Sequence, residues 1–139
     1  MKRHPKLHAL SSEHHAALVL ARKLARHTGA WTVADATALQ DRFARELEPH
    51  FRVEEELLLP ALQDAGRMDL AERTSSDHTA LRAFVAAGPT DDETSVRAFA
   101  DRLREHVRFE EHELFPSCEA LLSEAALARL PGREGRGTK

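Results

Sequence analysis

An eleven-residue pattern, His-x-Arg-x-Glu-Glu-x-x-Leu-x-Pro, occurs twice in this chain of 139 residues. The first copy spans residues 50–60 and the second spans residues 106–116. A shorter pattern, two serines followed by an acidic residue and a histidine, lies upstream of each copy at residues 11–14 and 75–78. We therefore interpret the chain as one duplicated hairpin, in which each half supplies a lone histidine and then a His-x-x-x-Glu pair.

Composition favours a single all-α domain. The length is that of one domain, and Ala, Leu, Arg and Glu dominate a sequence that has no Tyr. Acidic and basic residues are intermixed and give a formal net charge of -3, so no basic face for nucleic acid is expected. Cys118 is the only cysteine, which excludes an intrachain disulfide and a cysteine metal cluster.

Nothing in the sequence predicts a membrane or secretory segment. No apolar run approaches the length of a membrane span, and residues 1–5 lead into no apolar stretch of the signal type. We therefore expect a cytoplasmic protein with no membrane partner.

Helical spacing of apolar residues predicts four helices in an antiparallel up-down-up-down bundle. The first helix should run to about His27, and the second should begin near Thr32 and end at Gly66. Pro49 lies inside the second helix and lacks a backbone N–H, so we expect a kink or a loosened turn immediately before His50.

The second half of the chain predicts a short third helix with its apolar face at residues 71–85, a longer fourth helix, and a small C-terminal helix. The dipeptide at 88–89, Gly-Pro, should separate the third helix from the fourth, and Ser123 can cap a short C-terminal helix. The bundle domain is predicted to cover residues 1–130. Residues 131–139 are polar and Gly-rich, and are predicted to form a flexible tail.

Ionisable residues interrupt the apolar stripes of these helices. The expected inward stripe of the second helix consists of Phe43, Leu47, His50, Glu54, Leu57 and Ala61, and that of the fourth consists of Phe99, Leu103, His106, Glu110 and Leu114. A lone ionised carboxylate among apolar side chains costs several kcal/mol, and two nearby carboxylates repel each other. Bound metal cations would remove both penalties.

The stripes together carry six residues of metal-ligand type, which are His14, His50, Glu54, His78, His106 and Glu110. A His and a Glu at i and i+4 share one helix face, so one helix can offer both to the same ion. If each carboxylate bridges, each of two ions receives two imidazoles and two carboxylate oxygens, and a shared oxo or hydroxo group would be a fifth ligand. A position then stays open on each ion. Such a site suits iron that binds or activates a small diatomic molecule, although the ligand types also admit manganese or zinc.

Several neighbouring residues are expected to stay outside this ligand set. His15 adjoins His14 but points to another face of the helix, so it should be exposed or contact a ligand from outside. The other neighbours, which we expect to be exposed, are Glu55, Glu56, Glu111, His112 and Glu113. Whether His15 or one of these Glu residues adds a ligand stays open. A competing hypothesis is a metal-free core in which His and Glu pairs satisfy one another and respond to pH.

The order His, His-x-x-x-Glu, His, His-x-x-x-Glu resembles the hemerythrin-like, or HHE cation-binding, domains over roughly residues 11–122. The resemblance implies a four-helix bundle around a non-haem di-iron centre. It also implies the ligand assignment: His14 with His50 on one iron, His78 with His106 on the other, and Glu54 and Glu110 as bridges. Members of the family carry or sense oxygen, handle nitric oxide or peroxide, sense iron, or repair iron centres.

Two positions depart from the oxygen-carrying members of this family. Thr74 stands where those proteins have an additional His, and Glu110 follows His106 at four residues where they have an Asp at five. These differences argue against reversible oxygen carriage.

The first functional hypothesis is therefore a di-iron protein that binds or reacts with oxygen, nitric oxide or peroxide in sensing, protection or iron redox chemistry. Enzymatic turnover is left undecided. The alternative is an iron-responsive or iron-holding module without turnover, whose output is contact with a partner protein. A third hypothesis is a metal-free helical interaction domain.

Overall fold

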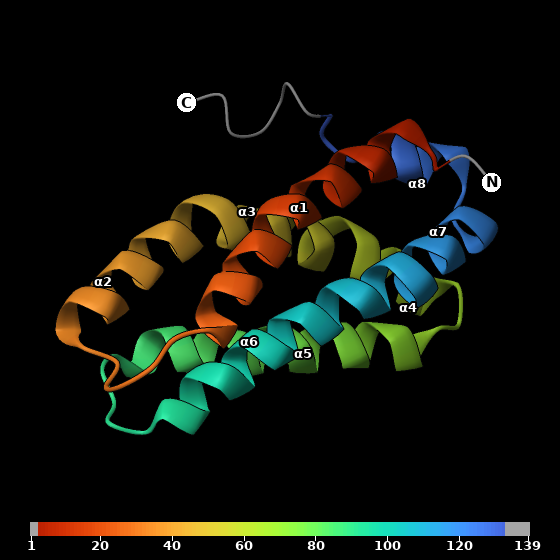
Figure 1. Cartoon of the computed structure of the whole chain (residues 1–139). Coiled ribbons are helices and arrows are strands. Elements are labelled where there is room, and N and C mark those ends of the chain that lie inside the picture. Colours follow the sequence, from red (N-terminus) through yellow and green to blue (C-terminus); the bar gives the residue numbers. More distant parts are fainter. Residues whose placement is uncertain (1–2, 133–139) are drawn as a thin grey trace.

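The computed structural model describes residues 3–132, and these form helices joined by short loops (Figure 1). The elements in chain order are α1 (Pro5–Ala25), α2 (Val33–Arg42), η1 (Phe43–Leu47), α3 (Glu48–Val53), η2 (Glu54–Leu58), α4 (Leu59–Asp64), α5 (Met68–Ala87), α6 (Glu93–Phe109), η3 (Glu110–Leu114), α7 (Phe115–Leu121) and α8 (Glu124–Ala128). The prediction of an all-α chain is confirmed. The predicted flexible tail falls mostly on residues 133–139, which lie outside the described residues.

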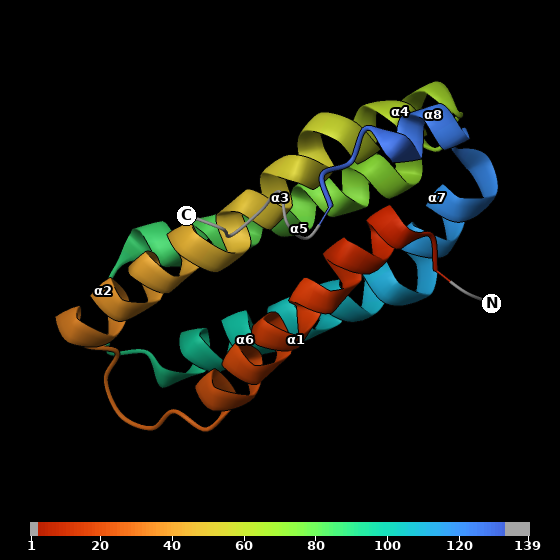
Figure 2. The same cartoon turned by 90° about the horizontal axis from the view of Figure 1, so that it is seen from above.

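These elements build four antiparallel rods, as Figures 1 and 2 show from two directions. The first rod is α1, the second runs without interruption from α2 to α4, the third is α5, and the fourth runs from α6 to α7. Rod α1 packs along α6, and α5 contacts α4, α6 and α2. At one end, the two inter-helix loops are joined by backbone hydrogen bonds in both directions between Trp31 and Thr90. The predicted up-down-up-down bundle with a short C-terminal helix is confirmed.

Capping residues set the helix boundaries. Thr32 accepts from the N–H of Asp35, and the Asp35 carboxylate accepts from the N–H of Thr32, which forms a capping box at the start of α2. Ser123 caps α8 as expected, by accepting from the N–H of Ala126. The third helix, α5, is 20 residues long, so the prediction that it is short is wrong. It ends only at Gly88, whose φ of 82° is a left-handed conformation that favours glycine.

Three π-helical turns interrupt the second and fourth rods, and each ends two residues before a proline. The turns η1, η2 and η3 are closed by hydrogen bonds from Glu48 N–H to Phe43 O, from Leu59 N–H to Glu54 O and from Phe115 N–H to Glu110 O. Each donor is the residue before Pro49, Pro60 or Pro116. A proline ring clashes with the carbonyl four residues earlier, and a wider turn relieves this clash. The loosened turn expected before His50 is therefore present.

The wide turn η2 shifts the inward face of its helix by one residue. Leu58 and Leu62 are 1% and 0% exposed, whereas Leu57 and Ala61, which we expected on the inward stripe, are only half-buried. That part of the prediction is wrong because a π turn contains an extra residue, so the α-helical period no longer continues across it.

This register predicts unequal costs for truncating adjacent leucines. Leu58→Ala should destabilise the protein by about 2–5 kcal/mol, because it opens a cavity in a closed core. Leu57→Ala should cost no more than about 1.5 kcal/mol, because part of that side chain already faces solvent. Urea unfolding of both variants measures the difference. Equal costs would contradict the shifted register.

The apolar core is divided into two clusters. One fills the end of the bundle near the Trp31 loop and includes Leu20, Leu39 and Phe99. The other fills the opposite end and includes Leu62 and Phe115. The ionisable residues of the stripes lie in a buried layer between these clusters.

Candidate metal centre

All six predicted ligand residues point into this middle layer. His14 comes from α1, His50 and Glu54 from the second rod, His78 from α5, and His106 and Glu110 from the fourth rod. Each is buried, with exposed fractions from 0% for Glu54, His78 and Glu110 to 5% for His14. The bundle thus collects four imidazoles and two carboxylates from four separate rods into one dry layer.

The six residues form two groups that share both carboxylates. One group contains His14, His50, Glu54 and Glu110, and the other contains Glu54, His78, His106 and Glu110. Within each group, one ligand atom from each residue lies within 4.8 Å of all the others. Either group could hold one metal ion, so the layer could hold two.

Glu54 spans the groups with its two oxygens. Its Oε2 lies 2.9 Å from Nε2 of His50, and its Oε1 lies 3.1 Å from Nε2 of His78. Glu54 follows His50 by one helical turn, so the first contact is local. The second crosses to another rod. A carboxylate placed in this way could contribute one oxygen to each candidate group.

Glu110 spans the groups in the same way from the opposite rod. Its Oε1 lies 2.7 Å from Nε2 of His14 and 3.4 Å from Nε2 of His50. Its Oε2 lies 2.9 Å from Nε2 of His106. The duplicated sequence pattern thus becomes an approximately twofold arrangement of side chains.

The polar atoms of this layer fit a cation. Among the described residues, both oxygens of Glu54, Oε2 of Glu110, and Nε2 of His78 and His106 are buried, and their N–O contacts of 2.9–3.1 Å lack hydrogen-bond geometry. Such atoms are costly in a native core. If two ligand atoms each lie about 2.0–2.2 Å from one ion and the ligand–ion–ligand angle is about 90°, the two atoms are about 3 Å apart. The N–O contacts of 2.7–3.4 Å are of this size.

Each imidazole is oriented by a second carboxylate on its other nitrogen. The four contacts are His14 Nδ1 to Glu111 at 2.6 Å, His50 Nδ1 to Glu13 at 2.8 Å, His78 Nδ1 to Glu55 at 2.6 Å and His106 Nδ1 to Asp77 at 2.9 Å. An ionised carboxylate only accepts, so each Nδ1 carries the proton and donates it. The lone pair of a neutral ring is then left on Nε2, which faces the shared carboxylates.

This outer set corrects one prediction. Glu55 and Glu111 were expected to be exposed, but both are half-buried because they accept hydrogen bonds from His78 and His14. The duplicated sequence pattern contains the information from which these contacts could have been predicted. The second Glu of each eleven-residue copy is the acceptor for the lone histidine of the other half. The acidic residue before each lone histidine is the acceptor for the histidine that opens a copy.

The other neighbours lie where they were expected. His15, Glu56, His112 and Glu113 are exposed, and neither candidate group includes them. Thr74 is fully buried, and its hydroxyl donates to the carbonyl of Leu70 at 2.8 Å. It therefore takes no part in either group.

The charges of this layer compensate one another strongly. Burial alone would lower the pKa of the His106 imidazole, but the carboxylates of Glu110 and Asp77 outweigh burial and raise it to about 10. The pKa values of His14 and His50 are also raised despite burial, by their carboxylate neighbours. Burial would raise the pKa of Glu110, but the surrounding histidines hold it well below its usual range. The layer thus requires positive charge, which protons or metal ions can provide.

The outer carboxylates should tune metal affinity without being ligands. Glu55→Gln and Glu111→Gln keep the side-chain size but weaken the alignment and basicity of His78 and His14, so each should lower metal affinity about 10–100-fold. Competition with a chelator of known affinity measures this change. Glu56→Gln is the matched control, because Glu56 is exposed on the same helical turn. Unchanged affinity in both test variants would contradict the orienting role.

Comparison with known proteins agrees with this geometry. A family model described as the hemerythrin HHE cation-binding domain matches residues 6–118. The chain belongs to this family. The match includes all six candidate ligands, and HHE domains bind metal cations. No curated protein and no solved structure matches the chain. Among the residues that the structure describes, no helix combines the length and the apolar character that a membrane span requires.

Proposed function

We propose that this HHE domain is a non-haem di-iron protein that binds or reacts with oxygen, nitric oxide or peroxide, in sensing, protection or iron redox chemistry. The proposal rests on the paired ligand groups together with a small apolar cavity beside them. Two iron ions bound here would supply open coordination positions and one-electron redox chemistry. The cytoplasmic location predicted above is part of the same proposal.

The cavity lies against the side of the layer formed by His14, His50, His106 and Glu110. Its volume is about 10 Å³ for the centre of a water-sized molecule, which is room for about one such molecule. Two further acidic residues, Glu13 and Glu46, also line it, and its apolar lining consists of Ala17, Leu47, Phe51, Leu103 and Val107. A cavity of this size suits a ligand about as small as a diatomic molecule or a peroxide.

The surrounding side chains also hold the imidazoles rigidly. Phe51 stacks on the His78 ring at a centroid distance of 3.8 Å, and Phe115 stacks on the His14 ring at 5.4 Å. Both phenylalanines are almost completely buried. With Nδ1 fixed by a carboxylate and a ring face fixed by stacking, the Nε2 atoms keep their direction when a small molecule enters or leaves.

A cavity-filling variant tests this function. Ala17 is 3% exposed and lines the cavity, so Ala17→Leu should occupy the space without removing a metal ligand. After anaerobic loading with ferrous iron, both proteins should hold equal iron, but the spectral response to nitric oxide should fall at least about 10-fold in the variant. The matched control is Leu18→Met, because Leu18 adjoins Ala17 but does not line this cavity.

The result of this test separates the two leading hypotheses. A wild-type protein that binds iron but shows no spectral response to nitric oxide, oxygen or peroxide would contradict the proposed function. The iron-holding interaction module would then be the better account. A full response in Ala17→Leu would contradict the assignment of this cavity as the ligand site.

A further inference from the structure

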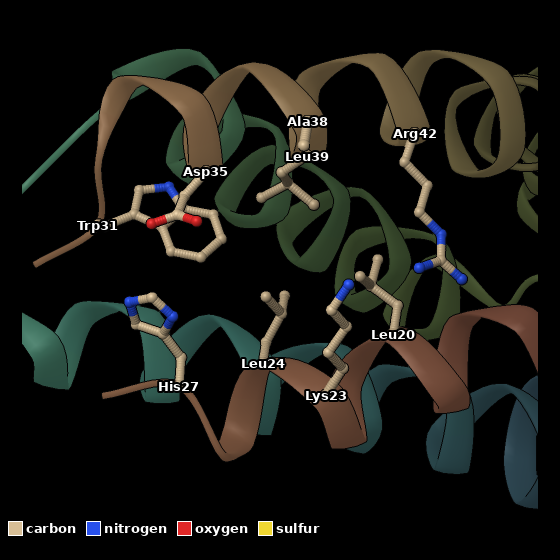
Figure 3. A pocket seen from close by; sticks show the side chains of 9 residues that line it. All are labelled: Leu20, Lys23, Leu24, His27, Trp31, Asp35, Ala38, Leu39 and Arg42. Atoms are coloured by element: carbon tan, nitrogen blue, oxygen red, sulfur yellow. The ribbon is translucent and has the colours of Figure 1, made fainter. Parts of the chain in front are cut away.

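A second, larger cavity lies between α1 and α2, at the end of the bundle near the Trp31 loop (Figure 3). Its volume is about 170 Å³ for the centre of a water-sized molecule. It is separate from the metal centre, because none of the six candidate ligands lines it. The space is therefore large enough for an organic molecule, and the metal chemistry does not account for it.

The walls of this cavity are apolar and well anchored. Leu20 and Leu24 come from α1, Leu39 comes from α2, and Trp31 closes one end. Each is no more than 5% exposed, so these walls belong to the packed core. Trp31 is held by its two backbone hydrogen bonds with Thr90 and by edge-on contact with the His27 ring at 5.0 Å. An apolar chain placed here would be covered on several sides.

Two cations converge on the other end of the cavity. Figure 3 shows the Lys23 side chain extending from α1 and the Arg42 side chain extending from α2 toward the space between the helices. Within residues 3–132, the ammonium of Lys23 has no hydrogen bond or ion pair, and Arg42 is paired with Glu46 at 2.9 Å. The acidic residue that lines the cavity, Asp35, is engaged in the capping box near Trp31. The end at Lys23 thus carries uncompensated positive charge.

We propose that this cavity binds a small carboxylate with an apolar chain. The carboxylate would lie between Lys23 and Arg42, and the chain would lie along Leu24 and Leu39 toward Trp31. Charge complementarity fixes the orientation of such a ligand, and burial of its chain supplies most of the affinity. The proposal does not depend on the identity or presence of the metal.

The Arg42–Glu46 pair gives this site a distinctive response to mutation. A bound carboxylate competes with Glu46 for the same guanidinium. Glu46→Gln should therefore release Arg42 and tighten carboxylate binding, whereas Arg42→Ala should weaken it. If the two mutations of this ion pair change the carboxylate affinity in opposite directions, the site is distinguished from an apolar cavity that binds any apolar molecule. Glu46 also lines the small cavity beside His50, so a carboxylate bound at Arg42 would alter the charge next to the metal centre.

The only tryptophan of the chain is Trp31, which makes its fluorescence a direct reporter for this cavity. The full chain should be titrated with octanoate and, separately, with its neutral counterpart octanol. We expect a saturable fluorescence change with octanoate, and affinities lowered about 3–10-fold by Lys23→Ala and by Arg42→Ala. Octanol binding should be unaffected by both. Arg26→Ala is the matched control, since Arg26 is an exposed cation near Lys23 that does not line the cavity.

A filling variant, Ala38→Phe, checks the location without adding a second tryptophan. It should abolish the octanoate response while circular dichroism shows the same helix content as the wild type. The proposal is overturned if the fluorescence response of the wild type does not saturate with octanoate. It is also overturned by equal octanoate affinity in Lys23→Ala, Arg42→Ala and the wild type, or by an undiminished response in folded Ala38→Phe.

Discussion

Glu110→Ala is expected to abolish the binding of both metal ions, because this carboxylate places one oxygen in each ligand group. Loss of a shared ligand leaves each group with two imidazoles and one carboxylate oxygen, and leaves Glu54 as the one anionic candidate ligand for two dications. Bound metal should therefore fall from about two ions per chain to near zero at micromolar metal. Glu54→Ala should behave in the same way.

A histidine variant provides the contrast. His14 belongs to one group only, so His14→Ala should leave the His78 and His106 group able to bind, with about one ion retained per chain. Glu113→Ala is the matched control for Glu110→Ala, because Glu113 is exposed on the same π turn. Elemental analysis after gel filtration measures all four proteins. Equal metal content in Glu110→Ala and His14→Ala would contradict the bridging role.

Metal removal is expected to have the largest effect on stability. A cation at about 1,000 times its dissociation constant stabilises a folded protein by about 4 kcal/mol per site, if the unfolded chain does not bind it. Chelation should therefore lower the melting temperature by more than about 10 °C in a domain of this size. Scanning calorimetry of the loaded and chelated protein measures the difference. A melting temperature that is unchanged by chelation would contradict a metal site within this layer.

The chelated protein should also acquire its own pH dependence. The His106 pKa is raised from 6.5 to about 10, so the protonated ring stabilises the folded state fully below pH 6.5. That contribution is lost as pH rises toward 10. His14 and His50 act in the same direction. Stability of the chelated protein should therefore fall between pH 6.5 and 10, while the metal-loaded protein changes less, because its imidazoles are already neutral ligands.

Glu54→Ala provides a control for the claim that bound metal ions stabilise the fold. The substitution should lower stability more in the presence of ferrous iron than in the presence of a chelator, because with iron the variant also loses the stabilisation that bound ions give the wild type. Equal destabilisation of both forms would show that Glu54 acts only as a partner of the histidines.

The clustering of the six candidate ligands could be predicted from the sequence because their spacing is local and repeated. His50 and Glu54 are four residues apart on one helix, so they share a face whatever the tertiary structure is. The same holds for His106 and Glu110. Because the pattern is duplicated, each half carries a buried carboxylate that needs cationic partners. Both halves are therefore expected to face one common layer.

The outer carboxylates and the helix register were harder to predict, because both depend on contacts between rods. Glu55 is one residue from Glu54, yet its partner His78 lies on α5. The π turns moved Leu58 inward, although the repeat aligns Leu58 with Leu114 and could have identified it. Apolar periodicity assumes a constant helical period, and a proline-induced wide turn breaks that assumption.

The cavity between α1 and α2 could not be predicted from the sequence either. From the sequence alone, ordinary core positions would be expected for Leu24, Leu39 and Trp31, and an ordinary surface position for Lys23. Their convergence depends on the spacing between α1 and α2, which the packing of α1 on α6 and of α2 on α5 determines.

The most direct test of the account is to load the metal-free protein anaerobically with ferrous iron, remove unbound iron, and count iron per chain by elemental analysis. The paired groups of His14, His50, His78 and His106 with the shared Glu54 and Glu110 predict about two irons per chain. Iron at background in the wild type, equal to that of a Glu54→Ala and Glu110→Ala double variant, would contradict it.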